Sequence, residues 1–276
     1  MRANHAKRRL AAGEPSIGTW LSIPSPEAAE FLGRLPFDWL TVDAEHNPVD
    51  IRTLSQMFAA IGAGGTAPMV RIPWNTPETF KRVLDAGAWG IVVPMVNSKE
   101  EAEQAVQAAR YYPMGNRSVG GGRHALSFNT GGKTYYENAN DNILLVLQIE
   151  HIDGVNNIEE IMSVPGFDAC FIGPNDLAAS MGLGLGVSLE SDIPELVDAI
   201  KTIREVTKKH GKAPGIHTSG PDGMKQRIAE GFQYCAMASE MKFMLEGLTN
   251  SIKESGWTPS ELAEIETAEA GATVRY

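Results

Sequence analysis

Residues 143–150 read ILLVLQIE, and this stretch has the pattern of a β-strand that is buried on both faces. Strands with one solvated face alternate apolar and polar residues, whereas strands covered on both faces are apolar almost throughout. The run stays apolar up to Gln148 and ends in Glu150, so polar side chains appear only near its carboxyl end. The stretch therefore predicts a central strand of a parallel sheet.

Similar stretches recur along the chain and alternate with segments of helical periodicity. This alternation is typical of repeated βα units. Because barrels of about 250 residues commonly form one domain, we expect a single (β/α)8 barrel over residues 1–276. A short helix is expected at 3–12, and a helical tail from about residue 250, with a helix at 260–268. The expected strands are 17–23, 38–44, 68–73, 90–95, 143–150, 168–173, 213–218 and 233–239.

Capping residues mark the ends of several expected helices. Ser25 and Thr76 are expected N-caps, and each precedes a proline, which fits the first helical turn. Asp50 is a third expected N-cap, and Gly33 and Gly87 are expected to end helices. Further helices are expected at 98–110, 193–210 and 221–230.

The longest connection, residues 111–142, has no clear period and contains a glycine triplet at 120–122. Connections of this length inside a compact domain are usually functional or mobile. In (β/α)8 barrels the loops at the carboxyl ends of the strands build the active site. We therefore expect this segment to lie over that face, as a lid, as an anion-binding loop or as a packing loop.

The composition describes an acidic globular protein, with 43% hydrophobic residues and a formal net charge of −10. Nucleic-acid binding relies on Lys and Arg, so this balance argues against it. The first 16 residues lack the apolar core of a secretory signal, and no apolar run is long enough to cross a membrane. Cys170 and Cys235 lie in apolar runs without zinc-site spacing, which indicates buried free thiols. We expect a cytoplasmic protein without nucleic-acid or membrane partners.

Two acidic residues lie where neighbouring strands end, at the mouth of the expected barrel. Glu150 ends the strand at 143–150, and Asp176 follows the strand at 168–173. Taken singly, Glu150 could be a solvated rim residue and Asp176 a helix N-cap. A buried carboxylate is costly unless it is paired or ligated, and a pair of carboxylates with open positions suits Mg²⁺ or Mn²⁺. Together they predict a site for one divalent cation.

Other polar residues near the strand ends suit acid–base and anion chemistry. Arg71 lies in an apolar strand, where its guanidinium either binds a substrate oxygen or pairs with an internal carboxylate such as Asp43. His46 is either structural or a general acid–base residue. Asp85 lies between a helix and a strand, at the opposite end of the barrel, so a role for it requires contact with another subunit. For His217 at the end of strand 213–218, substrate contact and packing both remain open.

The expected strands contain no lysine. An enzyme that forms a Schiff base with a carbonyl substrate would present one inside the barrel. Carbonyl chemistry on this chain would therefore need the cation as its electron sink.

At these residues the chain resembles the HpcH/HpaI family of class II aldolases, which cleave 4-hydroxy-2-oxo acids. The resemblance runs from residue 17 to about residue 245, and the combination of its motifs is specific although each alone is weak. The matching stretches are FDWLTVDAEHNP (37–48), APMVRIPWN (67–75), VLDAGAWGIVVPMVNSKEEAEQAVQAARYYPMGNRSVG (83–120), QIEHIDGVNNIEEI (148–161) and GFDACFIGPNDLAASMG (166–182).

The resemblance implies a role for each matching position. Glu150 and Asp176 look like the ligands of Mg²⁺, Mn²⁺ or Co²⁺. His46 looks like the acid–base residue, or the residue that orients a metal-bound water, with Asp43 and Asp85 as its partners. The backbone around Asn175 looks like the seat of the substrate carboxylate. The implied substrate contacts are Arg71, Gln148, Gly173, Pro174 and Asn175.

The implied reaction is the reversible cleavage of a 4-hydroxy-2-oxo acid into pyruvate, or a close 2-oxo acid, and an aldehyde through a metal-stabilised enolate. Three alternatives remain open. Two are an acyl-CoA lyase of the citrate lyase or malyl-CoA lyase type and a non-catalytic oxo-acid-binding barrel. The third is a phosphate-binding isomerase, for which only Gly220 and Gly223 indicate an anion site. The resemblance also implies a homo-hexamer, a trimer of dimers with an exchanged C-terminal helix. The chain departs from the family pattern at 120–128, at His217 and after Ser239, and these differences bear on substrate choice.

Overall fold

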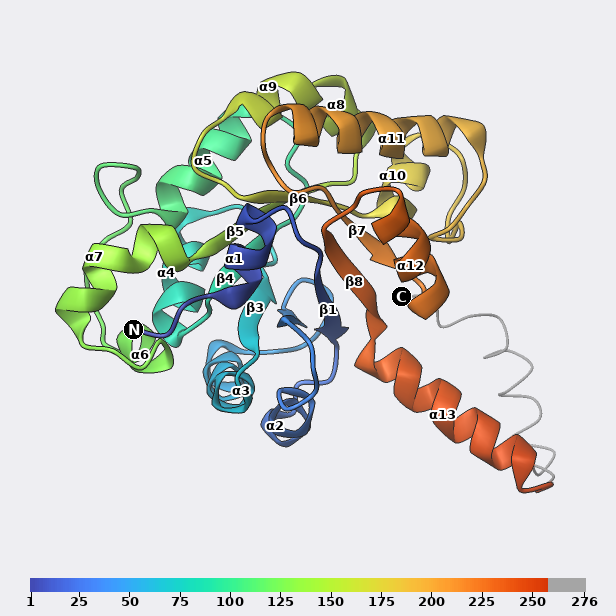
Figure 1. Cartoon of the computed structure of the whole chain (residues 1–276), viewed down its shortest axis with the longest axis horizontal. Helices are drawn as coiled ribbons and strands as arrows, with labels where there is room; N and C mark the ends of the chain where they lie inside the picture. The colour runs from blue at the N-terminus through green and yellow to red at the C-terminus, as the bar shows by residue number, and fades with distance from the viewer. Residues whose placement is uncertain (258–276) are drawn as a thin grey trace.

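The strands form one closed parallel barrel in the computed structural model, which describes residues 1–257 (Figure 1). Neighbouring strands follow in chain order, and β8 pairs with β1, so no strand edge in the barrel is left open. The eight expected strands are all present, and the predicted (β/α)8 fold is confirmed. The strands are β1 (Ser16–Leu21), β2 (Trp39–Asp43), β3 (Ala67–Arg71), β4 (Gly90–Val93), β5 (Leu144–Ile149), β6 (Ala169–Ile172), β7 (Gly215–Thr218) and β8 (Tyr234–Ser239).

Burial explains the apolar strand sequences. Every residue of β5 is buried, as is every residue of β2. Inward side chains fill the barrel and outward ones face the surrounding helices, so neither face of these strands tolerates regular polar residues. Inside the barrel Trp39 stacks on Tyr234 with ring centroids 4.2 Å apart. Polar side chains therefore become possible only where the strands end.

The helices that cover the barrel begin and end close to the expected caps. The Ser25 side chain accepts a hydrogen bond from the Ala28 amide, and Asp50 caps the next helix in the same way. Gly33 and Gly87 are the C-cap residues, and Gly87 has a φ of 113° that favours glycine. The helices are α1 (His5–Ala11), α2 (Pro26–Leu32), α3 (Ile51–Gly64), α4 (Pro77–Ala86), α5 (Lys99–Ala109), α6 (Arg123–Ser127), α7 (Gly132–Asn142), α8 (Ile152–Asn156), α9 (Ile158–Ser163), α10 (Pro174–Ser180), α11 (Pro194–Lys209), α12 (Pro221–Ala229) and α13 (Glu240–Glu254).

The position predicted for residues 111–142 is wrong. This segment connects α5 to β5, so it lies at the amino ends of the strands and not over the mouth. It folds into α6 and α7 and packs beside the start of β4, where the Trp89 Nε1–H group donates to Ser127 Oγ at 2.9 Å. The length of the segment predicted an active-site loop, but helix α5, which precedes it, ends at the side of the barrel where the strands begin.

Helix α13 extends away from the barrel body and is drawn in red in Figure 1. Among its described residues only Glu240 is buried, and several apolar side chains are exposed. The exposed apolar residues of α13 include Met244, Leu245, Leu248 and Ile252. The helix expected at 260–268 lies outside the described residues.

Two further sequence predictions can be compared with the structure. Cys170 and Cys235 are free and buried, as expected. Within residues 1–257, no helix combines the length and hydrophobicity needed to cross a membrane.

Candidate active site

A pocket of about 230 Å³ lies at the mouth of the barrel. Strand ends and the first turn of α10 supply its carboxylate side, and β1, β7 and β8 contribute to the other side. The predicted site residues that line it are Asp43, His46, Arg71, Gln148, Gly173, Pro174, Asn175 and Asp176. Among these predicted residues, Asp43 and Asp176 are the farthest apart in the sequence, at 133 positions.

Arg71 is held by two carboxylates at one side of the pocket. Its Nε and one terminal nitrogen donate to the two oxygens of Asp43, each at 2.8 Å, and Nε lies 3.2 Å from a Glu45 oxygen. The indole of Trp20 covers the guanidinium, with Cζ 4.7 Å from the ring centroid. Burial alone would lower the pKa of Arg71, but Asp43 and Glu45 reverse this effect and raise it. The internal ion pair left open by the sequence is thus present, and Arg71 still lines the pocket.

His46 is the most accessible of the predicted catalytic residues. Its side chain is 56% exposed, and Nε2 lies 3.6 Å from a carboxylate oxygen of Glu45. Asp43 is occupied elsewhere, because it accepts hydrogen bonds from Arg71 and from Asn47. Burial raises the pKa of Glu45, although Arg71 and His46 act against that rise. The structure therefore pairs His46 with Glu45.

Glu150 is a buried carboxylate beside the pocket, and it is not among the residues that line it. One of its oxygens accepts a hydrogen bond from the Met95 amide at 3.0 Å, and the other accepts from the Gln148 amide nitrogen. Burial and then the nearby charge of Asp176 raise the pKa of Glu150 to about 7. A negative charge at Glu150 is therefore costly unless a cation accompanies it.

Because Gly173 has no side chain, the Glu150 carboxylate can lie close to its backbone. A Cβ atom at Gly173 would lie 2.6 Å from a Glu150 oxygen, closer than such contacts occur in proteins. Gly173 is also the N-cap position of α10, which places Asp176 in the first turn of the helix. Asp176 is thus not the N-cap, and this alternative reading of the sequence is wrong.

The donors around Glu150 fit a hard divalent cation. Three carboxylates, those of Asp43, Glu45 and Glu150, interact electrostatically with the Arg71 guanidinium, and Asp176 interacts with Glu45 and Glu150. The Oε1 atom of Gln148 is enclosed and has no hydrogen-bond partner in the described part of the chain. Cations such as Mg²⁺ prefer oxygen ligands and bind through one or two carboxylates completed by water and substrate. Residues 1–257 contain no cluster of three or more acidic, histidine or cysteine side chains arranged to bind a metal, so a cation here would depend on such additional oxygens.

Asp85 lies at the other end of the barrel, as the sequence predicted. It sits in the last turn of α4, where Arg117 donates to Oδ1 at 2.7 Å and His124 Nδ1 lies 3.8 Å away. Its side chain is 28% exposed. Asp85 therefore does not reach the pocket of its own chain.

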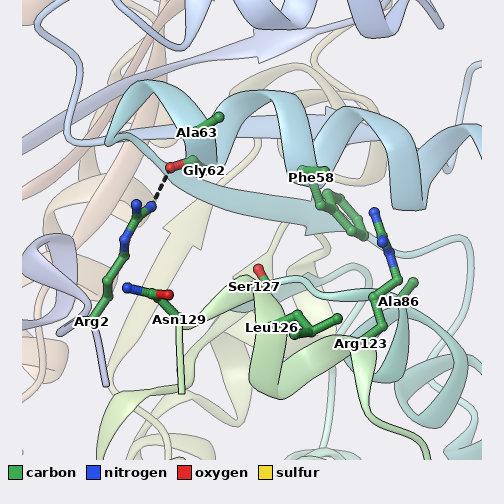
Figure 2. Close-up of a pocket in the computed structure, with 10 residues that line it drawn as sticks. Arg2, Phe58, Gly62, Ala63, Ala86, Arg123, Leu126, Ser127 and Asn129 are labelled. Atoms are coloured by element: carbon green, nitrogen blue, oxygen red, sulfur yellow. Dashed lines mark hydrogen bonds between the residues drawn. The ribbon is translucent and has the colours of Figure 1, made fainter. Parts of the chain in front are cut away.

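A second pocket of about 220 Å³ lies between α3 and α6, and none of the predicted site residues lines it (Figure 2). Arg2 and Arg123 flank it, and Arg2 donates to the Gly62 carbonyl at 2.6 Å. Its lining residues include no carboxylate and no histidine. This second pocket therefore lacks the acid–base and metal-binding groups that gather at the mouth.

Residues 16–246 match the HpcH/HpaI aldolase/citrate lyase family. The chain belongs to this family. It is 38% identical over 238 residues to the 5-keto-4-deoxy-D-glucarate aldolase of Shigella dysenteriae serotype 1 (strain Sd197). The aligned region covers 86% of this chain and 91% of that protein. A solved HpcH/HpaI aldolase/citrate lyase family protein from Burkholderia cenocepacia J2315 has a TM-score of 0.85 at 32% identity, covering 92% of this chain and 100% of the other. The citrate synthase SbnG has a TM-score of 0.80 at 29% identity, covering 91% and 96%.

The HpcH/HpaI match extends from β1 into α13, so it includes every strand that contributes to the pocket. Together with the aldolase names of the relatives, it confirms the resemblance and the predicted enzyme class, an aldolase of the lyase type. The sequence reasoning did not single out several residues of this pocket. The unpredicted lining residues are Trp20, Ser22, Phe171, Leu189 and Ser239. Trp20 and Ser239 lie near strand ends and could have been found by that signal, whereas Leu189 lies in a loop without one.

Proposed function

We propose that this protein is a divalent-metal-dependent aldolase that cleaves a 4-hydroxy-2-oxo acid into pyruvate and an aldehyde. The observation that carries the proposal is the buried carboxylate of Glu150, which interacts with Asp176 beside a pocket that also contains Arg71. Two carboxylates and a fixed guanidinium suit a substrate that carries both a carboxylate and a keto oxygen.

Each proposed role follows from the position of the residue. Glu150 and Asp176 would hold one divalent cation, Mg²⁺, Mn²⁺ or Co²⁺, which when bound supplies Lewis acidity and a template for the substrate. Arg71 is fixed in place before the reaction and supplies positive charge where the keto oxygen becomes negative. The remaining substrate contacts are assigned to Gln148 and to the backbone from Gly173 through Pro174 to Asn175.

The proton on the 4-hydroxyl group must leave as the C3–C4 bond breaks. His46 is proposed to receive it, directly or through a water, because its ring lines the pocket and remains accessible. Glu45 lies beside the ring, with a carboxylate oxygen 3.6 Å from Nε2. The electrons of the broken bond pass to the pyruvate fragment, where Arg71 faces the developing charge.

We propose that the active oligomer is a hexamer, a trimer of dimers. Asp85 is partly exposed at the end of the barrel away from its own pocket, so it would act only in the site of a neighbouring subunit. The exposed apolar side chains of α13 fit a helix that packs against another copy of the chain.

The relatives act on 5-keto-4-deoxy-D-glucarate, as their name states, and this compound is a candidate substrate for the present chain as well. The acyl-CoA alternative is less well supported, because Arg71 is the only Lys or Arg among the lining residues of the described pocket. Coenzyme A would need further cationic groups for its phosphates.

The decisive experiment measures pyruvate release from a panel of 4-hydroxy-2-oxo acids that includes 5-keto-4-deoxy-D-glucarate. We expect turnover with Mg²⁺, Mn²⁺ or Co²⁺ and its loss in EDTA. In a parallel assay, the pyruvate methyl protons should exchange with deuterated water. Full turnover after exhaustive chelation would exclude the metal role. Pyruvate binding without exchange would instead indicate a non-catalytic barrel. Saturation of the enzyme by an acyl-CoA thioester would favour the acyl-CoA lyase.

A further inference from the structure

The pocket has a second side that differs chemically from the carboxylate side. Trp20, Phe171 and Leu189 give it apolar surface, and β7 adds the imidazole of His217. The ring centroid of His217 lies 6.0 Å from that of Trp20 and 6.5 Å from that of Phe171. His217 therefore adds polar nitrogen atoms to an otherwise apolar wall.

One nitrogen of His217 is left without a hydrogen bond. The Nε2 atom is enclosed, and no group within residues 1–257 bonds to it, although the ring as a whole lines the pocket and is partly exposed. Buried polar atoms in folded proteins are nearly always paired, because an unpaired one loses its hydration without compensation. A partner in the pocket satisfies it once the ring turns so that Nε2 faces the cavity that the ring lines.

The surroundings of His217 determine which kind of partner fits. Burial lowers the pKa of His217 to about 4, and the charge of Arg71 acts in the same direction, while the backbone of Ala238 and the carboxylate of Asp43 oppose it. The ring is therefore neutral at physiological pH, with one N–H donor and one acceptor nitrogen. A neutral imidazole suits a hydroxyl group, which can donate or accept, better than it suits a carboxylate.

The proposed function assigns the 2-oxo acid end of the substrate to Arg71, Glu150 and Asp176. These residues belong to β3, to the end of β5 and to α10. The rest of the substrate must then occupy the remainder of the pocket, which includes the surface of His217, next to the Trp20 ring that covers Arg71.

We infer that His217 is a specificity-determining residue that hydrogen-bonds a hydroxyl group on the aldehyde-derived part of the substrate. The enzyme then prefers 4-hydroxy-2-oxo acids that carry a further hydroxyl group over their alkyl analogues. This inference rests on the proposed function for the placement of the substrate, whereas the unpaired nitrogen is independent of it.

The test compares two substrates that differ by one hydroxyl group. Cleavage of 4,5-dihydroxy-2-oxopentanoate releases pyruvate and glycolaldehyde, and cleavage of 4-hydroxy-2-oxopentanoate releases pyruvate and acetaldehyde. We expect the wild-type enzyme to have the higher kcat/KM for the dihydroxy acid. His217→Leu should reduce that preference roughly tenfold or more, because the hydroxyl group then lacks its partner. His217→Gln, which keeps polar atoms, should restore part of it.

The controls separate specificity from folding and from catalysis. His210→Leu changes a histidine that pairs with Glu159 on the surface and should behave as the wild type. Exchange of the pyruvate methyl protons should be unchanged in His217→Leu, because pyruvate lacks the aldehyde-derived part. Its melting temperature should fall only slightly, because Nε2 has no protein partner and the ring loses only its contact with the Ala238 backbone. Equal losses on both substrates, or an unchanged preference, would overturn the inference.

A failure of the proposed function would give a different result. In that case the wild-type protein would neither cleave these acids nor catalyse exchange. Calorimetric binding of the same two acids would still decide the role of His217. A preference for the dihydroxy acid that is lost in His217→Leu would support the inference, and equal affinities in the wild-type protein would refute it.

Discussion

Asp43 and Arg71 are register partners across β2 and β3, and two hydrogen bonds of 2.8 Å join their side chains. Residues paired in register on neighbouring strands project to the same side of the sheet, so both side chains enter the barrel at its mouth. The pair is largely buried, with side-chain exposures of 13% for Arg71 and 6% for Asp43. The guanidinium is therefore oriented before any substrate arrives.

Replacement of Arg71 by lysine separates its charge from its shape. Lysine keeps a positive charge near Asp43 but lacks the planar fork. We expect turnover to fall about 100- to 1,000-fold, as for the loss of one preorganised donor. Arg71→Ala should also destabilise the fold by about 3–5 kcal/mol, because Asp43 is left buried without a partner. Steady-state kinetics and thermal denaturation measure the two effects. Arg34→Lys, at an exposed pair with Glu30, is the control, and normal turnover of Arg71→Lys would contradict the role.

Glu150 should make the metal-free protein sensitive to pH. Its pKa rises from the ordinary value of 4.5 to about 7 in the folded protein. The folded state then keeps a proton that the unfolded state releases, so stability is greatest below about 4.5 and declines as the pH rises to about 7. The loss should be on the order of 3 kcal/mol. Thermal denaturation in EDTA measures it, and Glu150→Gln should abolish it.

The same residue should link stability to the cation. At pH 8 the addition of Mn²⁺ should raise the melting temperature of the wild-type protein, since a ligand that binds only the folded state stabilises it. Glu150→Gln should show little response. An equal response of the two proteins would place the cation elsewhere.

A methyl group at Gly173 should disturb the site without unfolding the barrel. The added Cβ would lie 2.6 Å from a Glu150 oxygen, so the carboxylate must move. We expect Gly173→Ala to reduce turnover at least tenfold, because a displacement on the order of 1 Å can cost about 100-fold. Gly62→Ala is the matched control, because no atom outside its own helix lies within 4 Å of its Cβ position. Equal activity of the two variants would show that Glu150 can shift harmlessly.

Asp85 can be tested by mixing inactive subunits. Asp85→Asn and His46→Ala should each lower turnover by about 100-fold or more, the usual contribution of acid–base groups. If Asp85 acts in a neighbouring site, oligomers that contain both variants include sites with both native side chains. Co-expression should then recover activity that neither variant has alone. Absence of recovery would argue that Asp85 acts only within its own chain, through its contact with Arg117.

Helix α13 offers a test of the oligomer. Leu248 is 56% exposed. It shares a helical face with Met244, four residues before it, and with Ile252, four residues after it. Leu248→Glu should reduce the mass measured by light scattering, because a charge is introduced into an apolar contact. Asn250→Glu places the same charge on the opposite face and should leave the mass unchanged. A wild-type protein that is already monomeric would refute the hexamer.

The sequence by itself determined the strands, the main helix caps and the mouth at which the polar residues gather. Strands such as 143–150 are recognisable because burial on both faces leaves a local apolar signature. The carboxyl ends of parallel strands point the same way, so chain direction alone places Glu150 and Asp176 near each other. The length of residues 111–142 predicted a loop over the mouth. The segment instead follows a helix and precedes a strand, so the direction of the chain places it at the amino ends of the strands.

Only the tertiary structure decided which side chains pair within the mouth. Asp43 joins Arg71 because barrel closure sets the register of β2 against β3, and His46 is left with Glu45. Likewise, the unpaired nitrogen of His217 becomes visible only when Trp20 and Phe171 enclose the ring. Such pairings depend on the closure of the whole barrel, and no local stretch of the chain encodes them.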